Sequence, residues 1–221
     1  MKTKDAYTAF LELVRKVNDD ALKVFDDALT YILRYLSIDH IDTTWTHGDS
    51  DNQAFAAFMF DYLDYQKEQT ATRFWYDAWG DMFMELSGKF KSFRGQFFTP
   101  AAVADLCARM SRPENTDAHP LINDCACGSA RMLLAAEQLA YEETQVRPYL
   151  IGEDIDGMCC KMAAINLAVH GCLGEVIRHD SLQHPDEFSY GYIINELLSA
   201  GLPFPSIRRS ENKSDFMKFR K

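Results

Sequence analysis

The sequence lacks the features of three specialised protein classes. It has no run of about 18 consecutive apolar residues, the length that a membrane-spanning helix needs, and no apolar signal core follows its first five residues. Its 6 cysteines have neither the density of a secreted disulfide scaffold nor the C-x-x-C spacing of zinc knuckles. We therefore expect a cytoplasmic protein with reduced thiols, no membrane contact and no bound metal.

Basic residues are outnumbered as well, because 23 Lys and Arg stand against 33 Asp and Glu, which gives a net charge of -10. Lys and Arg side chains supply most of the sequence-independent affinity for nucleic acid, so this balance argues against a chain that grips nucleic acid alone. With 221 residues, 47% of them hydrophobic, the chain can still bury a sizeable core in one or two domains.

The first part of the chain repeats apolar residues every three or four positions, the period of an amphipathic helix. A polar stretch over 39–52 predicts a loop. We therefore predict a helical domain over residues 1–88, with three or four helices whose aromatic side chains form the core. The apolar positions are Phe10, Val14, Val17, Ala21, Phe25, Ala28 and Ile32, then Phe55, Phe58, Met59, Tyr62 and Leu63, and finally Phe74, Trp75, Ala78, Met82 and Leu86.

After residue 88 short apolar strands alternate with helices, which indicates an α/β domain over residues 89–221. Such alternation predicts a parallel sheet covered by helices on both faces. The predicted strands are 121–124, 149–153, 176–178 and 190–195, and two of the predicted helices are 131–143 and 158–170.

A further helix is predicted to start at Thr99 and Pro100. A threonine hydroxyl can accept from the free N–H groups of a helix start, and proline suits the first helical position. The apolar face of this helix is predicted to consist of Val103, Leu106, Cys107 and Met110.

Polar residues at the carboxyl ends of the predicted strands are candidates for a binding site, because ligands of such sheets lie beyond those ends. Asp124, Glu153, Asp156 and Asp180 qualify, although Asp156 can equally cap the helix that follows it. A turn with Gly128 lets the backbone approach a ligand, and an acidic residue that ends the second strand can bind both hydroxyls of a ribose. The glycines that a pyrophosphate requires are absent, which favours a nucleoside without phosphates.

Three segments carry a more specific pattern: Phe98-Thr99-Pro100, Asp124-Cys125-Ala126-Cys127-Gly128-Ser129, and the stretch from Gly152-Glu153 to His170-Gly171. Together they resemble the N-6 adenine DNA methylase family, notably the modification subunits of type I restriction systems. The resemblance implies a Rossmann-like methyltransferase sheet with a preceding helical domain. It also implies that the chain uses S-adenosylmethionine to methylate adenine N6 in DNA, within DNA modification or restriction.

The resemblance implies roles for residues at the predicted strand ends and at the helix start. The methionine end of the cofactor would contact Phe98, Thr99 and Pro100, and the methionine and sulfonium would lie against Asp124, Ala126, Cys127, Gly128 and Ser129. Glu153 would bind the ribose, Asp154 and Ile155 would flank the adenine, and Asp180 with Ser181 would meet the adenine amino group.

The chain departs from the family pattern in two places. In the first loop Cys125 replaces a usual proline and Ala130 a usual glycine, and a left-handed backbone at Ala130 would cost about 1 kcal/mol. After the fourth strand the family has Asn or Asp, Pro, Pro and an aromatic residue, which hold an extruded base. This chain has Asn195-Glu196-Leu197-Leu198 there and no Pro-Pro pair, so Asn195 is the candidate catalytic residue.

Three functional hypotheses remain open. The chain is a component of an adenine-N6 DNA methyltransferase that contacts duplex DNA with a specificity subunit or another partner protein. Alternatively, it is a cofactor-binding or assembly module that has lost catalysis. In the third hypothesis it methylates RNA or a small molecule through an acceptor site within 188–207.

Overall fold

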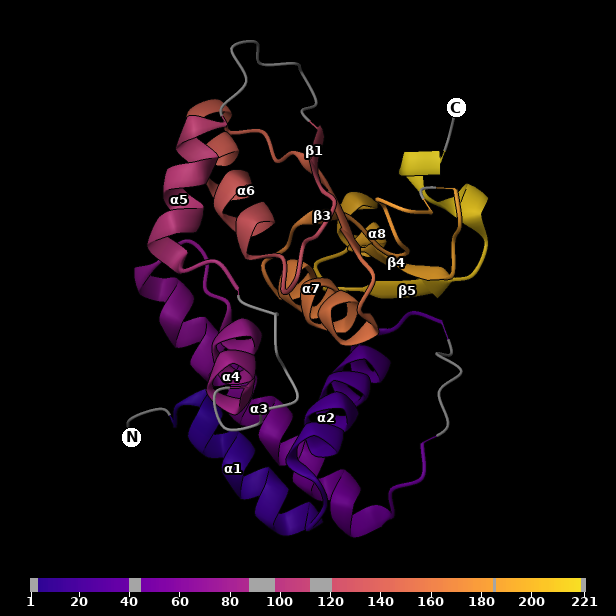
Figure 1. The fold of residues 1–221 in the computed structure, drawn as a ribbon. Coiled ribbons are helices and arrows are strands. Elements are labelled where there is room, and N and C mark those ends of the chain that lie inside the picture. The colour runs from indigo at the N-terminus through magenta and orange to yellow at the C-terminus, as the bar shows by residue number, and fades with distance from the viewer. Residues whose placement is uncertain (1–3, 40–44, 88–97, 112–120, 185, 220–221) are drawn as a thin grey trace.

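The computed structural model describes residues 4–39, 45–87, 98–111, 121–184 and 186–219. Figure 1 shows the amino-terminal helices in its lower part and a five-stranded sheet with its own helices above them. None of the described helices is long and apolar enough to cross a membrane.

The described part of the amino-terminal half forms helices, as predicted. They are α1 (Ala6–Val17), α2 (Ala21–Leu36), α3 (Asp49–Thr72) and α4 (Ala78–Ser87). The first apolar stripe is split over two helices, because Asn18 ends α1 in a left-handed conformation (φ 57°) and the Asp20 carboxylate caps α2. Helix α3 begins inside the predicted loop 39–52, of which 40–44 lie outside the described residues. The domain boundary at residue 88 also lies outside them and stays a prediction.

Aromatic side chains form the centre of these helices, which confirms the predicted core. Phe25 packs edge-on against Phe10 and Trp79, and Phe58 contacts the same two rings. The prediction is wrong for Phe74, whose side chain is 56% exposed. It lies in the connection between α3 and α4, where the helical period that would bury it is interrupted.

The sheet has the order β1-β2-β3-β4-β5. Its strands are β1 (Leu121–Asp124), β2 (Tyr149–Asp154), β3 (Leu173–Arg178), β4 (Tyr190–Ile194) and β5 (Ile207–Ser210). The first three are parallel, as predicted, and are connected by α6 (Arg131–Thr144) and α7 (Gly157–Val169). The prediction is wrong for β4, which is antiparallel to β3, and β5, which pairs antiparallel with β4, was not predicted. The described residues between β3 and β4 form no helix, and a parallel return needs a crossover of a dozen or more residues, usually a helix.

Different elements cover the two faces of the sheet. Helix α7 packs on β2, β3 and β4 and also contacts α2, so the buried core continues from the amino-terminal helices into the sheet. On the other face Phe216, which is fully buried, packs against Ile151, Ile177 and Ile193. Phe216 lies between two short 3-10 turns, η1 (Lys213–Asp215) and η2 (Met217–Phe219).

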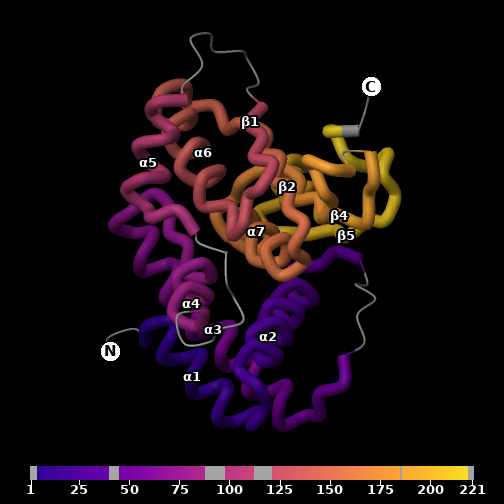
Figure 2. The backbone as a smooth tube through the Cα atoms, in the orientation of Figure 1, coloured from indigo at the N-terminus to yellow at the C-terminus, as the bar shows by residue number. Residues whose placement is uncertain are grey.

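Helix α5 (Ala101–Met110) differs from its prediction in two respects. It starts one residue later, with Pro100 at the cap and no side-chain cap bond from Thr99. The stripe that includes Leu106 and Met110 faces outward, at 55% and 76% exposure, whereas small alanine side chains are buried. Figure 2 shows α5 lying beside α6, and a face of small side chains allows that close approach.

A buried carboxylate connects the helical half to the sheet. Asp77 is 1% exposed and accepts four hydrogen bonds. Ser129 Oγ (2.5 Å) and Arg131 Nε (2.9 Å) donate to its Oδ2. Asn166 Nδ2 and Gly80 N, each at 2.7 Å, donate to its Oδ1. The donors come from α4, from the turn after β1, from the first residue of α6 and from α7, so this one side chain determines how these elements meet.

A histidine forms a second connection, within the helical half. The His47 ring bonds Asp27 on α2 through Nε2 (2.9 Å) and Asp51 on α3 through Nδ1 (3.1 Å). Burial of the ring opposes protonation, but the two carboxylates outweigh it and raise the pKa of His47 above its ordinary value. The ring, whose charged form the two carboxylates favour, therefore holds α2 and the start of α3 together.

We predict that Asp77→Ala lowers the free energy of unfolding by about 3–5 kcal/mol, because it leaves the buried guanidinium of Arg131 without its main partner. Urea denaturation followed by circular dichroism measures this loss. Asp81→Ala is the matched control, since Asp81 bonds the same guanidinium but its side chain is 50% exposed. We expect the control to lose less than about 1 kcal/mol. Equal losses in the two variants would contradict the central role of Asp77.

We predict that the stability difference between the wild-type protein and His47→Gln depends on pH. The folded pKa of His47 is raised, so its contribution is fully present below the unfolded pKa, about 6.5, and is lost as the pH rises through the folded pKa. Melting temperatures of both proteins from acidic to alkaline pH measure the difference. A difference that grows with rising pH would show that the sign is wrong.

Candidate functional site

The carboxyl ends of β1, β2 and β3 meet at one edge of the sheet, because the three strands are parallel. The turn after β1 is tied to the next strand there, since Gly128 N donates to Asp154 Oδ2 (2.9 Å). Ser181, which follows β3, donates from its Oγ to the carbonyl of Cys125 (2.8 Å). The structure therefore brings together the residues predicted after β1, β2 and β3.

The turn after β1 needs an unusual backbone. Gly128 has φ +54°, and a Cβ on it would lie 2.8 Å from the Phe98 ring. Phe98 therefore lies directly over the turn, while the carbonyl of Thr99 accepts from Arg131 at the start of α6 (3.1 Å). Ala130 also adopts the left-handed region (φ 71°), the conformation that carries a cost for a residue with a Cβ. The first motif, Phe98-Thr99-Pro100, is thus placed beside the turn.

Three aspartates give this edge its charge. Burial raises the pKa of Asp124 and of Asp154 above the ordinary value, and the neighbouring carboxylates Asp154 and Asp156, respectively, add to the effect. Asp180 behaves differently, because hydrogen bonds from the N–H groups of Gln183 and Leu182 lower its pKa. Asp124 and Asp154 are therefore carboxylates for which a positively charged ligand would be favourable.

The two acidic residues that end β2 point to opposite sides, since successive side chains of a strand alternate. Glu153, the predicted ribose ligand, is fully buried, and its carboxylate is bonded by Asn123, His179 and Lys218. Asp154 is partly exposed and lies at the turn with Gly128. Of the two, Asp154 is the one placed to meet a ligand at this edge.

Other predicted residues lie close in the chain to these aspartates. Ile155 is 64% exposed after Asp154. Leu182, which was not among the predicted residues, is 85% exposed two positions after Asp180. Asp156 caps α7 by accepting from the N–H groups of Met158 and Cys159, which confirms the simpler of its two interpretations.

Asn195 is not brought to this edge. Because β4 is antiparallel, its carboxyl end lies at the amino ends of β1, β2 and β3. Asn195 is fully buried there, with its Nδ2 donating to the carbonyls of Ala168 (3.1 Å) and Cys172 (2.7 Å). Its Oδ1 accepts from Ser206 N (2.9 Å). The side chain holds the end of α7 to β3 and β5, so the geometry gives no support to a catalytic role.

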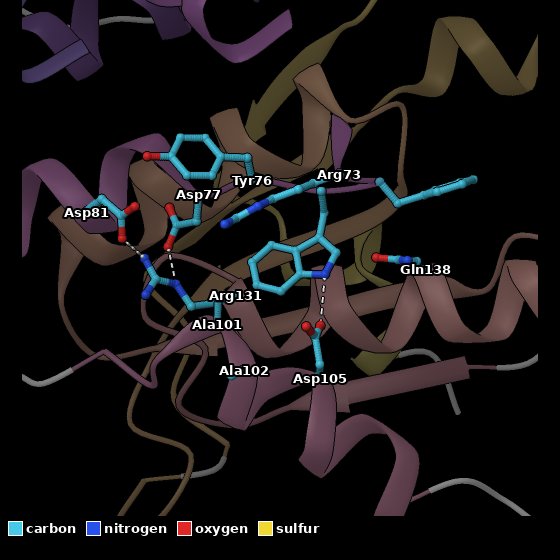
Figure 3. A pocket seen from close by; sticks show the side chains of 11 residues that line it. Arg73, Tyr76, Asp77, Asp81, Ala101, Ala102, Asp105, Arg131 and Gln138 are labelled. Atoms are coloured by element: carbon cyan, nitrogen blue, oxygen red, sulfur yellow. Dashed lines mark hydrogen bonds and ion pairs between the residues drawn. The ribbon is translucent and has the colours of Figure 1, made fainter. Parts of the chain in front are cut away.

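Sequence reasoning missed Asp77 and its bonds to the turn, because an aspartate before a helix is usually a cap. Figure 3 shows Asp77, Asp81 and Arg131 at a cavity of about 390 Å³ between the segment 73–77 and the helices α5 and α6. Trp75 donates there from its indole nitrogen to Asp105 (3.2 Å). The aspartates at the strand ends do not line this cavity, so it is separate from the candidate site.

Comparisons with known proteins agree with the fold. The model of the N-6 DNA methylase family matches residues 75–220. The methylase subunit of the type I restriction enzyme MjaIX from Methanocaldococcus jannaschii is 24% identical over 192 residues, which cover 82% of this chain and 32% of that protein. The chain thus spans about a third of the length of that relative, at 32%.

Solved structures are similar as well. A putative class I S-adenosylmethionine-dependent methyltransferase from Listeria monocytogenes superposes with a TM-score of 0.54 at 13% identity, covering 81% of this chain and 54% of that one. A methyltransferase subunit of a type I restriction-modification system from Streptococcus thermophilus has a TM-score of 0.43 at 23% identity, covering 81% of this chain and 42% of that one. The first likeness shows a methyltransferase fold.

We predict that Ala130→Gly changes the free energy of unfolding by less than about 1 kcal/mol. Relief of about 1–2 kcal/mol of left-handed strain offsets the lost methyl group and the added freedom of the unfolded chain. Ala163→Gly, at a fully buried position inside α7, is the control and should cost about 2 kcal/mol, because it relieves no strain. Denaturant titration of both variants decides the matter, and equal costs would mean that Ala130 is unstrained.

Proposed function

Because the chain belongs to the N-6 DNA methylase family, we propose that its strand-end site binds S-adenosylmethionine and that the chain serves in adenine-N6 methylation of DNA within a restriction-modification system. The observation that carries the proposal is the meeting of Asp124, the Gly128 turn, Asp154 and Asp180 at one edge of the sheet. A cytoplasmic location, where thiols stay reduced, is part of the proposal.

The residues at this edge fit a nucleoside without phosphates. The Asp154 carboxylate is held by the N–H groups of Gly128 and Asp156 and retains lone pairs for the ribose hydroxyls. Ile155 and Leu182 expose apolar side chains that can cover the two faces of the adenine. Asp180, beside Leu182, is the acceptor for the adenine amino group.

We place the methionine end of the cofactor at the other half of this edge, beside the turn after β1. Bound there, S-adenosylmethionine supplies an electrophilic methyl group on a positively charged sulfonium. Asp124 and Asp154 favour that charge, because a nearby cation offsets the burial and the carboxylate repulsion that raise their pKa values. Phe98 covers the turn on which the methionine would rest, and Cys127 and Ser129, both buried, help to shape it.

We expect that binding of the DNA, which accepts the methyl group, needs a partner protein. The chain has a net charge of -10 and spans about a third of its methylase-subunit relative, at 32%. We therefore propose that contact with duplex DNA requires a specificity subunit or another partner protein. A second candidate function is a cofactor-binding or assembly module without methyl transfer, and it is favoured by the burial of Asn195 at the opposite end of the sheet.

We predict that the wild-type chain binds S-adenosylmethionine and S-adenosylhomocysteine saturably, and that Asp154→Asn weakens both affinities by about 10- to 100-fold. The variant loses a charged acceptor for the ribose hydroxyls, a loss of about 1.5–3 kcal/mol. Isothermal titration calorimetry measures the affinities. Glu187→Gln, in the exposed loop after β3, is the matched control and should leave them unchanged.

Absence of binding to the wild-type chain would refute the proposed cofactor. Unchanged affinity in Asp154→Asn would refute the role of that residue. Transfer of a labelled methyl group to duplex DNA, assayed with and without a candidate specificity subunit, separates the two functions. Binding without transfer in either assay would favour the module over the enzyme component.

A further inference from the structure

One buried carboxylate joins the residues that stand immediately before the aspartates of the site. Glu153 Oε1 accepts from Asn123 Nδ2 (2.6 Å), and Asn123 precedes Asp124 on β1. Glu153 Oε2 bonds His179 Nε2, and His179 precedes Asp180 after β3. Glu153 itself precedes Asp154 on β2. The ends of all three parallel strands are thus tied to a single side chain that is fully buried.

The remaining partner of this carboxylate comes from the carboxyl-terminal segment. Lys218 Nζ forms an ion pair with Glu153 Oε2, and its side chain is 26% exposed. The four residues Asn123, Glu153, His179 and Lys218 are called the strand-end clamp below. Lys218 is the member whose charge opposes that of Glu153.

The carboxyl-terminal segment is fixed firmly enough to place Lys218. The N–H groups of Met217 and Lys218 donate to the two oxygens of Glu175 on β3, at 2.8 and 2.9 Å. Phe216, just before them, fills the space over Gly191, where a Cβ would lie 2.5 Å from its ring. The main chain around Lys218 is therefore held on the sheet before its side chain reaches Glu153.

The charge of Lys218 keeps Glu153 ionised inside the protein. Burial alone would raise the pKa of Glu153, but hydrogen bonds from Lys218, Asn123 and His179 outweigh it and lower the pKa below the ordinary value. Without the lysine, the partners that this fully buried carboxylate retains among the described residues are a side-chain amide and an imidazole. It would then take up a proton or turn away, and the bonds to β1 and to the end of β3 would weaken.

We propose that Lys218 is a positioning residue of the cofactor site, and that through Glu153 it holds Asp124, Asp154 and Asp180 in the arrangement that binds the cofactor. This inference rests on the proposed function for the identity of the ligand. The carboxyl-terminal segment thus supports the site without contacting the ligand, because the clamp lies on the other side of β2 from Asp154.

The test compares Lys218→Met, which removes the charge at similar length, with Lys218→Arg, which restores it. Lys213→Met is the control, because Lys213 lies in the same segment but bonds the carbonyl of Asp186, which is not a member of the strand-end clamp. Hydrogen exchange detected by NMR, without ligand, follows the N–H groups that bond the site aspartates. The groups measured belong to Ala126, Gly128 and Asp156, which bond Asp124 and Asp154. Calorimetry with S-adenosylhomocysteine follows the affinity.

We expect Lys218→Met to speed exchange at these three amides by about tenfold or more, with the amides of α1 and α3 unchanged. Its affinity for S-adenosylhomocysteine should fall by about tenfold, the scale on which a supporting hydrogen bond is felt at a ligand site. Lys218→Arg and Lys213→Met should stay close to the wild-type protein in both measurements.

Two results would overturn the inference: unchanged exchange at the three amides in Lys218→Met, or equally faster exchange throughout the protein, which would mean a general loss of stability. If the wild-type chain binds no ligand, the proposed function fails. The exchange rates still decide in that case whether Lys218 positions the strand ends.

Discussion

The arrangement of the molecule depends on one buried carboxylate, that of Asp77. Its donors belong to four segments, and one of them, Asn166, is 89 positions away in the chain. A buried charge is stable only when its hydrogen bonds are complete. The burial of Asp77 therefore requires all four donors to be in position together. Gly80 shows how little room is left, because a Cβ on it would lie 2.0 Å from Asp77 Oδ2. The helical half and the sheet are therefore one structure around this group.

The candidate site inherits its shape from that constraint. Ser129 and Arg131 bond Asp77 on either side of Ala130, so the turn after β1 is pinned where its backbone is left-handed. Arg131 also holds the carbonyl of Thr99, which places Phe98 over Gly128. The left-handed conformation of Ala130 is sustained by these contacts. The strand-end clamp lies on the other face of the sheet and ties the carboxyl ends of β1, β2 and β3 together.

Short-period patterns in the sequence predicted most of the helices and the three parallel strands correctly. The apolar repeats predicted the helices of the amino-terminal half, and the alternation of strands and helices predicted β1, β2 and β3 with their connections. The apolar pattern predicted the wrong buried face for α5, in which either of two stripes could pack against a neighbouring element. In α5 the larger stripe with Leu106 lies outward, because the alanine face packs more closely on α6. The predicted direction of β4 was also wrong, because the direction of a strand depends on the length and structure of the connection before it.

Motifs and periods that lie within a few residues of each other were enough to indicate the family, the class of fold and the segments that meet at the candidate site. Tertiary contacts were needed to show that Glu153 is buried whereas Asp154 is partly exposed, that Asn195 is buried at the opposite end of the sheet, and which donors surround Asp77 and Glu153. The physical reason is that a buried charge takes its partners from wherever the fold brings them. Lys218 reaches Glu153 across 65 positions of chain, a distance at which local pattern carries no information.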